Sequence, residues 1–324
     1  MRATSLGSLP GSDMAAALRL LLDEGTEVLA VPELPARGPE SQMIGRALGL
    51  GALPVETRIG RWHLADHRGR EQRRARAQWR SDLDDLEEAC QGYEGNVKIA
   101  LCGPWTLATL LELPRGGRVL GDGGALRELV ESLAFGLDEL LAEMRRRMPA
   151  VEWWLQIDEP MLDQVMTGGV ATISGLQRHR GVAPSEIADA LGSLGAPADL
   201  VALHVCGAPQ VDLLGHLELQ ALSVQISALT GSHCEALAGW FESGHHVWWG
   251  AVRTDQPDRL APIDSEVHAL LECLRRIGVD HEWHVNDLVT PACGLAAWSP
   301  SAARAALRQT GRIAQIAAEE LAAG

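Results

Sequence analysis

The stretch Val201-Ala202-Leu203-His204-Val205-Cys206-Gly207 decides how the rest of the chain is interpreted. Its apolar start is typical of a short buried strand, and the glycine marks where the strand ends. The strand therefore brings an imidazole, that of His204, and a thiol, that of Cys206, to its carboxyl end.

A second thiol follows another short apolar strand, in Leu288-Val289-Thr290-Pro291-Ala292-Cys293-Gly294. In a barrel of parallel strands the carboxyl ends meet at one mouth, so this thiol would meet the first pair of side chains there. Two thiolates and one imidazole are three ligands of a tetrahedral zinc site. A lone His-x-Cys on a strand is usually core, but this convergence predicts a metal site at His204, Cys206 and Cys293.

Strands and helices alternate along the whole chain. The predicted strands are residues 2–6, 28–32, 97–102, 151–157, 200–205, 221–226, 246–252 and 288–290. The predicted helices are residues 14–22, 40–48, 70–91, 126–148, 184–194, 232–242, 263–276 and 299–321. Eight such units predict parallel strands with right-handed crossovers, closed into a single (β/α)8 TIM barrel that spans residues 1–324 as one domain.

One insertion interrupts the alternation after the second strand, at about residues 52–94. Residues 55–64 alternate in polarity, which predicts a β-hairpin turning near Asp66-His67-Arg68-Gly69. A long, highly charged helix over residues 70–91 follows. Its charges are interpreted as a solvated face with intrahelical pairs.

Composition excludes several classes of function. The formal net charge is −15, which disfavours nucleic acid and anionic membranes as partners. No apolar run reaches the ~18–20 residues of a membrane span. The first residues also lack the apolar core of a signal peptide. With six widely spaced cysteines, these features predict a reducing, cytoplasmic setting without disulfides.

Adjacent carboxylates, Asp158 and Glu159, end the strand that begins at Val151. They would either cap a helix N-terminus or hold a cationic substrate group at the barrel mouth. A second candidate substrate contact is the glycine of Gly7-Ser8, which would permit close approach of the backbone to a ligand or simply make a turn.

Four motifs together resemble the catalytic barrel of cobalamin-independent methionine synthase, in the superfamily that includes uroporphyrinogen decarboxylase. Leu6-Gly7-Ser8-Leu9-Pro10 is similar to that family's I-G-S-F-P, and Gln156-Ile157-Asp158-Glu159-Pro160 matches its Q-I-D-E-P. His204-Val205-Cys206 matches its H-x-C, and Pro291-Ala292-Cys293-Gly294-Leu295 resembles its P-D-C-G-L. The motifs occur in the family's order and cover nearly the whole chain.

The resemblance implies a zinc-dependent methyltransferase that methylates the thiol of homocysteine, a small-molecule substrate. Zinc would be held by the two cysteines and the histidine already named. By the same carry-over Asp158 and Glu159 are the expected catalytic residues, with Asp158 on the substrate ammonium. Leu6, Gly7, Ser8 and Glu33 are the other expected substrate contacts.

Two departures from the family pattern bear on the metal and the donor. Gln225 stands where the family has a glutamate zinc ligand, so the fourth position falls to Gln225, to Glu235 or to a water or substrate. After the seventh strand the family's D-x-H segment is replaced by Arg253-Thr254-Asp255, which removes an expected acid. The expected donor is therefore methyltetrahydrofolate or methylcobalamin, the latter free or on a corrinoid protein.

Two alternatives stay open at this point. One is a metal-free lyase of the uroporphyrinogen decarboxylase type, with Arg37 and Arg253 gripping substrate carboxylates. The other is a non-catalytic thiol- or metal-binding relative that has lost its donor site. Motifs identify a site more safely than they identify a reaction.

Overall fold

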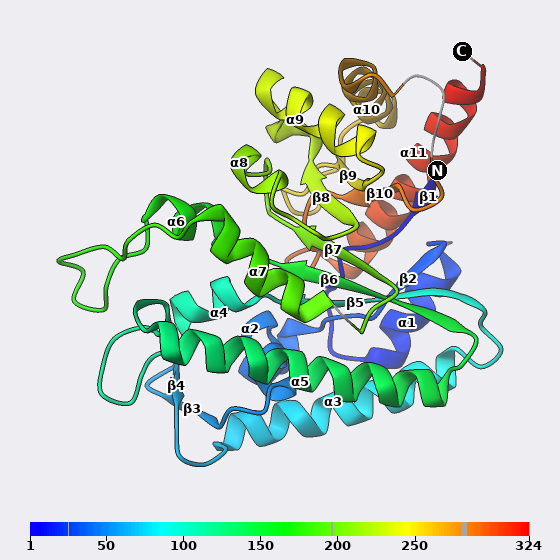
Figure 1. Cartoon of the computed structure of the whole chain (residues 1–324). Helices are drawn as coiled ribbons and strands as arrows, with labels where there is room; N and C mark the ends of the chain where they lie inside the picture. Colours follow the sequence, from blue (N-terminus) through cyan, green and yellow to red (C-terminus); the bar gives the residue numbers. More distant parts are fainter. Residues whose placement is uncertain (25, 196, 280–283, 324) are drawn as a thin grey trace.

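Eight parallel strands form a nearly closed barrel surrounded by helices, which confirms the predicted TIM barrel (Figure 1). The computed structural model describes residues 1–24, 26–195, 197–279 and 284–323. The hydrogen-bonded order is β1-β10-β9-β8-β7-β6-β5-β2, so the strands follow one another around the barrel in chain order. Their bounds are β1 Arg2–Ala3, β2 Val28–Ala30, β5 Gly95–Cys102, β6 Val151–Asp158, β7 Leu200–His204, β8 Ala221–Gln225, β9 His246–Val252 and β10 Leu288–Pro291.

Helices cover the outside of the barrel. The α-helices are α1 Met14–Asp23, α2 Met43–Leu50, α3 Arg70–Ala89, α4 Pro104–Leu110, α5 Gly123–Arg147, α6 Leu162–Thr167, α7 Pro184–Gly195, α8 Val211–Leu214, α9 Gly231–Glu242, α10 Ile263–Ile277 and α11 Pro300–Ala323. Short 3-10 turns are η1 Pro35–Arg37, η2 Pro39–Ser41, η3 Val119–Gly121 and η4 Ile226–Ala228. Sequence periodicity missed α4, α6 and α8, since helices of four to seven residues are too short to show a helical repeat. No helix of the described part of the chain is long and apolar enough to cross a membrane.

The seam between β1 and β2 closes in an unusual way. These strands are the two ends of the hydrogen-bonded order, and side chains join them: Ala3 N–H donates to Glu27 Oε2 at 2.7 Å, and Thr4 Oγ1 donates to the carbonyl of Val28 at 2.8 Å. In the described ranges, main-chain pairing across the seam begins beyond the two strands, where Glu33 N–H donates to the carbonyl of Gly7 at 3.0 Å. Gly7 has a φ of +114°, a conformation that favours glycine.

The insertion after β2 contains the predicted hairpin, but its predicted turn was wrong. Strands β3 Val55–Arg58 and β4 Arg61–Leu64 pair antiparallel, with Arg58 opposite Arg61. The turn is therefore the dipeptide Ile59-Gly60, whose φ angles are both positive, at 49° and 74°. Such a two-residue turn suits the twist of a hairpin, and the glycine is its only sequence signal.

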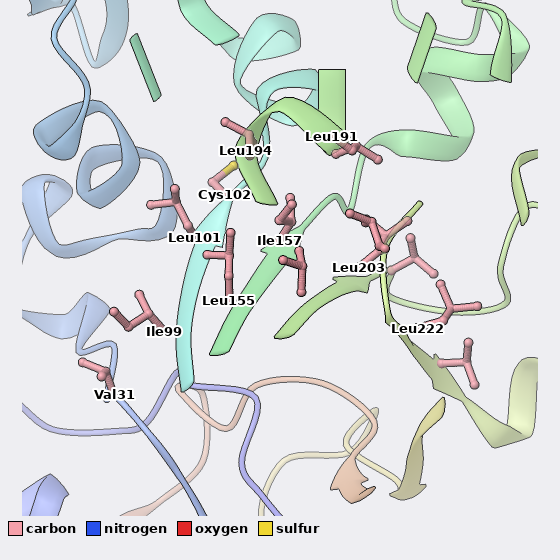
Figure 2. Packing of buried hydrophobic residues seen from close by; sticks show 14 of the residues in the cluster. Val31, Ile99, Leu101, Cys102, Leu155, Ile157, Leu191, Leu194, Leu203 and Leu222 are labelled. Atoms are coloured by element: carbon pink, nitrogen blue, oxygen red, sulfur yellow. The ribbon is translucent and has the colours of Figure 1, made fainter. Parts of the chain in front are cut away.

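Alternation along the barrel strands sorts side chains between two layers. Ile99, Leu155 and Leu203 face outward and belong to the same buried cluster as Leu191 and Leu194 of α7 (Figure 2). The residues between them point into the barrel, because successive side chains on a strand face opposite sides. This inner set includes Lys98, Gln156, Asp158 and His204, all buried. A separate apolar cluster, also of inward positions, contains the stacked rings of Trp154 and Trp248, 6.1 Å apart.

Helix packing at Gly136 gives a first testable prediction. A Cβ at this position in α5 would lie 2.4 Å from the carbonyl oxygen of Leu50, whereas one at Gly192 in α7 meets nothing within 4 Å. Gly136→Ala should therefore destabilise the protein by about 1–3 kcal/mol through overpacking. Gly192→Ala should stabilise it by about 0.4–1 kcal/mol, because alanine restricts the unfolded chain. Urea unfolding of both variants measures this; equal effects would contradict the packing described.

Candidate metal and substrate site

Three metal-ligating side chains converge at the carboxyl ends of β7 and β10. The imidazole of His204 and the thiols of Cys206 and Cys293 bring their ligand atoms within 4.8 Å of one another. Each is placed by its strand: His204 is the last residue of β7, and Cys293 follows β10 after a shift of register at Thr290 and Pro291. It is the one such group of histidine, cysteine and carboxylate side chains among the described residues.

The donor set and its geometry fit a zinc ion. The sulfur of Cys206 lies 3.6 Å from that of Cys293 and 3.6 Å from Nε2 of His204. The other ring nitrogen, Nδ1, lies 3.0 Å from Oγ of Ser223 on β8. That contact orients the ring so that Nε2 faces the thiols. A hydrogen bond to the second ring nitrogen plays the same orienting part for metal-bound histidines in general. Two soft sulfurs and an imidazole suit zinc and leave a fourth position open.

Electrostatics favours a thiolate in the cluster. The hydrogen bond from Cys206, and then that from His204, lower the pKa of Cys293 to about 4. In return, its hydrogen bond with Cys293 and burial raise the pKa of Cys206 well above its usual range. The pair therefore shares one proton, which a metal would displace.

The two proposed fourth ligands, Gln225 and Glu235, lie in different surroundings. The side chain of Gln225 is half-buried at the end of β8, and its Nε2 donates to Oγ of Ser227 at 2.8 Å. Glu235 is exposed on α9 and is absent from the group of converging ligands among the described residues. The structure brings together three ligands beside a cavity, and three protein ligands with a fourth position for water or substrate are typical of catalytic zinc.

A cavity of about 300 Å³ opens beside the three ligands. Its walls combine the ligand cluster with side chains from the carboxyl ends of other strands and from α2: Leu6, Ser8, Glu33, Pro35, Gln42, Met43, Gln156, Asp158, Pro160, His204, Cys206, Cys293 and Gly294. A Cβ at Gly294 would fall 1.8 Å from Oγ of Ser8, so glycine is required for this wall. The cavity therefore places two carboxylates beside the two thiols and the imidazole.

Asp158 and Glu159 divide the two roles that the sequence left open. Asp158 lines the cavity, accepting a hydrogen bond at 2.7 Å from Nε2 of Gln156. Glu159 instead caps the N-terminus of α4: it accepts from the main-chain N–H of Trp105 and Thr106 at 2.9 and 2.7 Å, and from Thr106 Oγ1 at 2.6 Å. Burial raises the pKa of Asp158, and it raises that of Glu159 to about 7.

The carboxylate of Glu33 lines the cavity and is paired with the guanidinium of Arg46. Burial raises the pKa of Glu33 to about 7, against the opposing effect of Arg46, whose Nε lies 3.2 Å from its carboxylate. The buried Asp82 of α3 in turn pairs with Arg46 at 3.5 Å and with Arg37 at 2.6 Å. The insertion helix thus braces a cavity carboxylate through one arginine.

The expected substrate contacts on the first segment are distributed over the cavity wall. Leu6 and Ser8 line the cavity, while Gly7 uses its carbonyl to pair with Glu33 N–H across the seam. Trp105 of α4 is buried and is not among the residues that line this cavity; its Nε1 donates to the carbonyl of Ile187.

The two arginines that a lyase of the uroporphyrinogen decarboxylase type would use lie outside this cavity. The described residues that line the cavity include no arginine. Arg37 is engaged with Asp82, and Arg253 lies in a separate 230 Å³ hollow with Arg259. The site therefore lacks the cationic grip that a polycarboxylate substrate needs.

Sequence reasoning missed the polar residues that support the site. Lys98, Gln156 and Ser223 lie inside the barrel, and each contacts a cavity side chain or its hydrogen-bonding partner. A lysine and a glutamine at inward positions of apolar strands were the available signals. The cross-strand register that joins them is not visible in the sequence.

The contact of Ser223 with the histidine ring predicts its contribution to metal binding. Ser223→Ala removes the outer partner of His204, and zinc affinity should fall about 10–100-fold. A competition titration with a chromogenic chelator measures the affinity. Ser227→Ala, which removes only the exposed partner of Gln225, is the matched control and should leave affinity unchanged. Equal affinities of the Ser223 variant and the unmodified protein would show that this contact does not support the metal.

Comparison with known proteins identifies related sequences and folds. Residues 142–316 match the family model of the cobalamin-independent synthase catalytic domain. This description contradicts the expectation of a methylcobalamin donor and a corrinoid protein partner, because the matched family works without cobalamin. No curated protein matches the chain.

Among solved structures, the fold is similar to that of a B12-independent methionine synthase from Shewanella sp. W3-18-1 in complex with selenomethionine. The TM-score is 0.64, with 16% sequence identity over 99% of each chain. A protein assigned as an alpha-L-fucosidase from Bacteroides thetaiotaomicron VPI-5482 covers 99% of this chain and 95% of its own at 10% identity, with a TM-score of 0.35. That score is too low to bear on the fold.

Proposed function

This chain belongs to the family of cobalamin-independent synthase catalytic domains, a methionine synthase-like methyltransferase family, and from that premise we propose that it methylates the thiol of homocysteine. The proposed donor is a methyltetrahydrofolate. The observation that carries the proposal is the convergence of His204, Cys206 and Cys293 on one wall of a cavity whose other walls hold two carboxylates.

The metal role is assigned to the three converging side chains. His204, Cys206 and Cys293 would hold zinc and leave its fourth position toward the cavity. A substrate thiol bound to zinc at that position would lose its proton at neutral pH, because coordination stabilises the thiolate. The hydroxyl of Ser223, 3.0 Å from Nδ1, can accept a hydrogen bond from that nitrogen, which leaves Nε2 free to bind the metal.

The amino-acid end of the substrate is assigned to the opposite wall. Asp158 would accept the substrate ammonium, with Glu33 as a second carboxylate. Leu6 and Ser8 border the same space, and Gly7 closes the wall by pairing with the Glu33 main chain. Holding the ammonium fixes the position of the substrate thiol relative to the incoming methyl group. This positioning lowers the entropic part of the reaction barrier.

The reaction balances without a redox step. A sulfur–carbon bond forms as the carbon–nitrogen bond of the folate donor breaks, with the methyl group moving in line between them. The thiol loses one proton and the departing folate nitrogen gains one. Glu159 takes no direct part in this proposal, since its carboxylate is occupied by the N-terminus of α4.

The test is transfer of a labelled methyl group by zinc-loaded protein. Labelled methyltetrahydrofolate, as the monoglutamate and as a polyglutamate, is incubated with L-homocysteine, and labelled methionine is quantified. Zinc-dependent formation of methionine is the expected result, with zinc-stripped protein as the control. Zinc-loaded protein that binds homocysteine but yields no methionine from either donor would overturn the proposal and favour a non-catalytic thiol-binding protein.

A further inference from the structure

We propose that Lys98 is a positioning residue for the amino-acid substrate, acting through Gln156 to hold Asp158 in the orientation that accepts the substrate ammonium. The inference rests on the proposed function for the identity of the substrate. It concerns a residue that lies behind the cavity wall and outside the set of residues lining the cavity.

The position of Lys98 is the first observation. It is the only lysine of the chain, so every other long cationic side chain is arginine. It lies in the middle of β5, fully buried, with Nζ 5.3 Å from the centroid of the Trp248 ring. A flexible ammonium with three donors fits this narrow interior, where a planar guanidinium would need more partners.

Hydrogen-bonding logic connects Lys98 to the cavity. Nζ of Lys98 donates to Oε1 of Gln156, and an ammonium can only donate. The amide oxygen therefore faces the lysine, and the amide nitrogen must face the other way. There Nε2 donates to Oδ1 of Asp158 at 2.7 Å and to the carbonyl of Leu6 at 3.0 Å. Both amide hydrogens are used, so one lysine fixes the donor that holds the Asp158 carboxylate.

Charge balance gives the second, independent reason. Glu33 and Asp158 are two buried carboxylates in one cavity, and each raises the cost of ionising the other. Arg46 lies against Glu33, whereas the cation behind Asp158 is Lys98. Burial lowers the pKa of Lys98 to about 7, and the carboxylates of Asp158 and Glu33 oppose that shift by favouring the ammonium. Lys98 opposes the upward shift that burial imposes on the pKa of both carboxyls. A neutral residue at position 98 would leave the carboxylates with less compensation for burial.

The arrangement makes a prediction that a purely structural role does not. If Lys98 acted only in the core, its loss would lower stability and affect all thiol substrates alike. If it positions Asp158, its loss penalises thiols that carry an ammonium and spares those that do not.

The experiment compares Lys98→Met with the unmodified protein, both loaded with zinc. L-Methionine and 4-(methylthio)butanoate, its analogue without the amino group, are titrated calorimetrically, and KM and kcat are measured for homocysteine and 4-mercaptobutanoate. The affinity for methionine and the KM for homocysteine should worsen by about 10–100-fold. Values for the analogues should stay within about twofold, and a double variant with Asp158→Asn should lose little beyond Asp158→Asn alone, because the two residues act as one unit.

Two controls keep structure and positioning apart. Gln72→Met removes another buried polar side chain, which bonds to main-chain groups of Leu48 at the end of α2 and of Leu53 and Val55 in the insertion. This variant should lower stability without changing the preference for the ammonium. Lys98→Gln retains an N–H donor for Gln156 and should bind methionine better than Lys98→Met. It replaces Lys98→Met in the test if that variant does not fold. Equal losses for both ligand classes, or additive losses in the double variant, would overturn the inference. The binding arm needs no turnover, so it stands or fails separately from methyl transfer.

Discussion

Replacing Cys293 by serine should remove the bound metal and abolish methyl transfer. The thiol of Cys293 lies 3.6 Å from that of Cys206 and has its pKa lowered to about 4, so it is the ligand most ready to bind as an anion. A serine hydroxyl is neutral at neutral pH and a poor partner for a soft-ligand zinc site. With two ligands left, the loss of zinc affinity should exceed the roughly 10–100-fold cost of losing an outer partner.

Metal content of the purified variant measures this loss directly. The unmodified protein should contain close to one zinc per chain, and the Cys293→Ser variant almost none, with methyl transfer below detection. Cys90→Ser is the matched control, since this thiol is buried at the end of α3 and its pKa is raised by burial alone. A serine variant that retains zinc and turnover would show that the site is not built on Cys293.

Asp158→Asn should weaken binding of the amino-acid substrate by two to three orders of magnitude. The substitution keeps the shape of the side chain but removes the charge that faces the ammonium. Breaking a buried ion pair costs about 3–5 kcal/mol, and the lower part of this range, about 3–4 kcal/mol, corresponds to roughly 10²–10³-fold in affinity. Zinc content should not change, because Asp158 is outside the group of three ligands.

Glu159→Gln is the neighbouring control for that experiment. Its carboxylate accepts three hydrogen bonds at the start of α4, so the variant should lose about 1–3 kcal/mol of unfolding free energy. Its affinity for methionine should remain normal. If Glu159→Gln lost substrate affinity and Asp158→Asn did not, the division of roles between the two carboxylates would be reversed.

The sequence predicts the barrel well because its strands are short apolar runs that are followed by turn residues such as glycine and proline. Residues 97–102 and 246–252, for instance, were expected as strands and lie within β5 and β9. The metal cluster also follows from sequence, since the carboxyl ends of parallel strands meet at one mouth. Local patterns of this kind need no knowledge of the register between strands.

Register decides what the sequence leaves open. Asp158 and Glu159 are adjacent, yet one lies in the cavity and the other reaches α4, because neighbouring residues of a strand end point to opposite sides. The support of Asp158 by Gln156 and Lys98 depends on how β5 pairs with β6. The hairpin turn was misplaced for a different reason: Ile59 adopts a positive φ that its side chain disfavours and that no propensity predicts.

The barrel is closed less firmly between β1 and β2 than between its other neighbouring strands, because these two strands are the ends of the hydrogen-bonded order. Among the described residues, backbone pairing across the seam is found only at the mouth, where Gly7 and Leu9 bond to Glu33, and these segments also border the cavity. An amino acid bound between Ser8 and Asp158 would contact the segment after β1 and the end of β6, and would thereby stabilise the seam. Amide hydrogen exchange at this joint should therefore be fast in the empty protein and slow when methionine is bound, while the exchange of β5 and β6 stays unchanged.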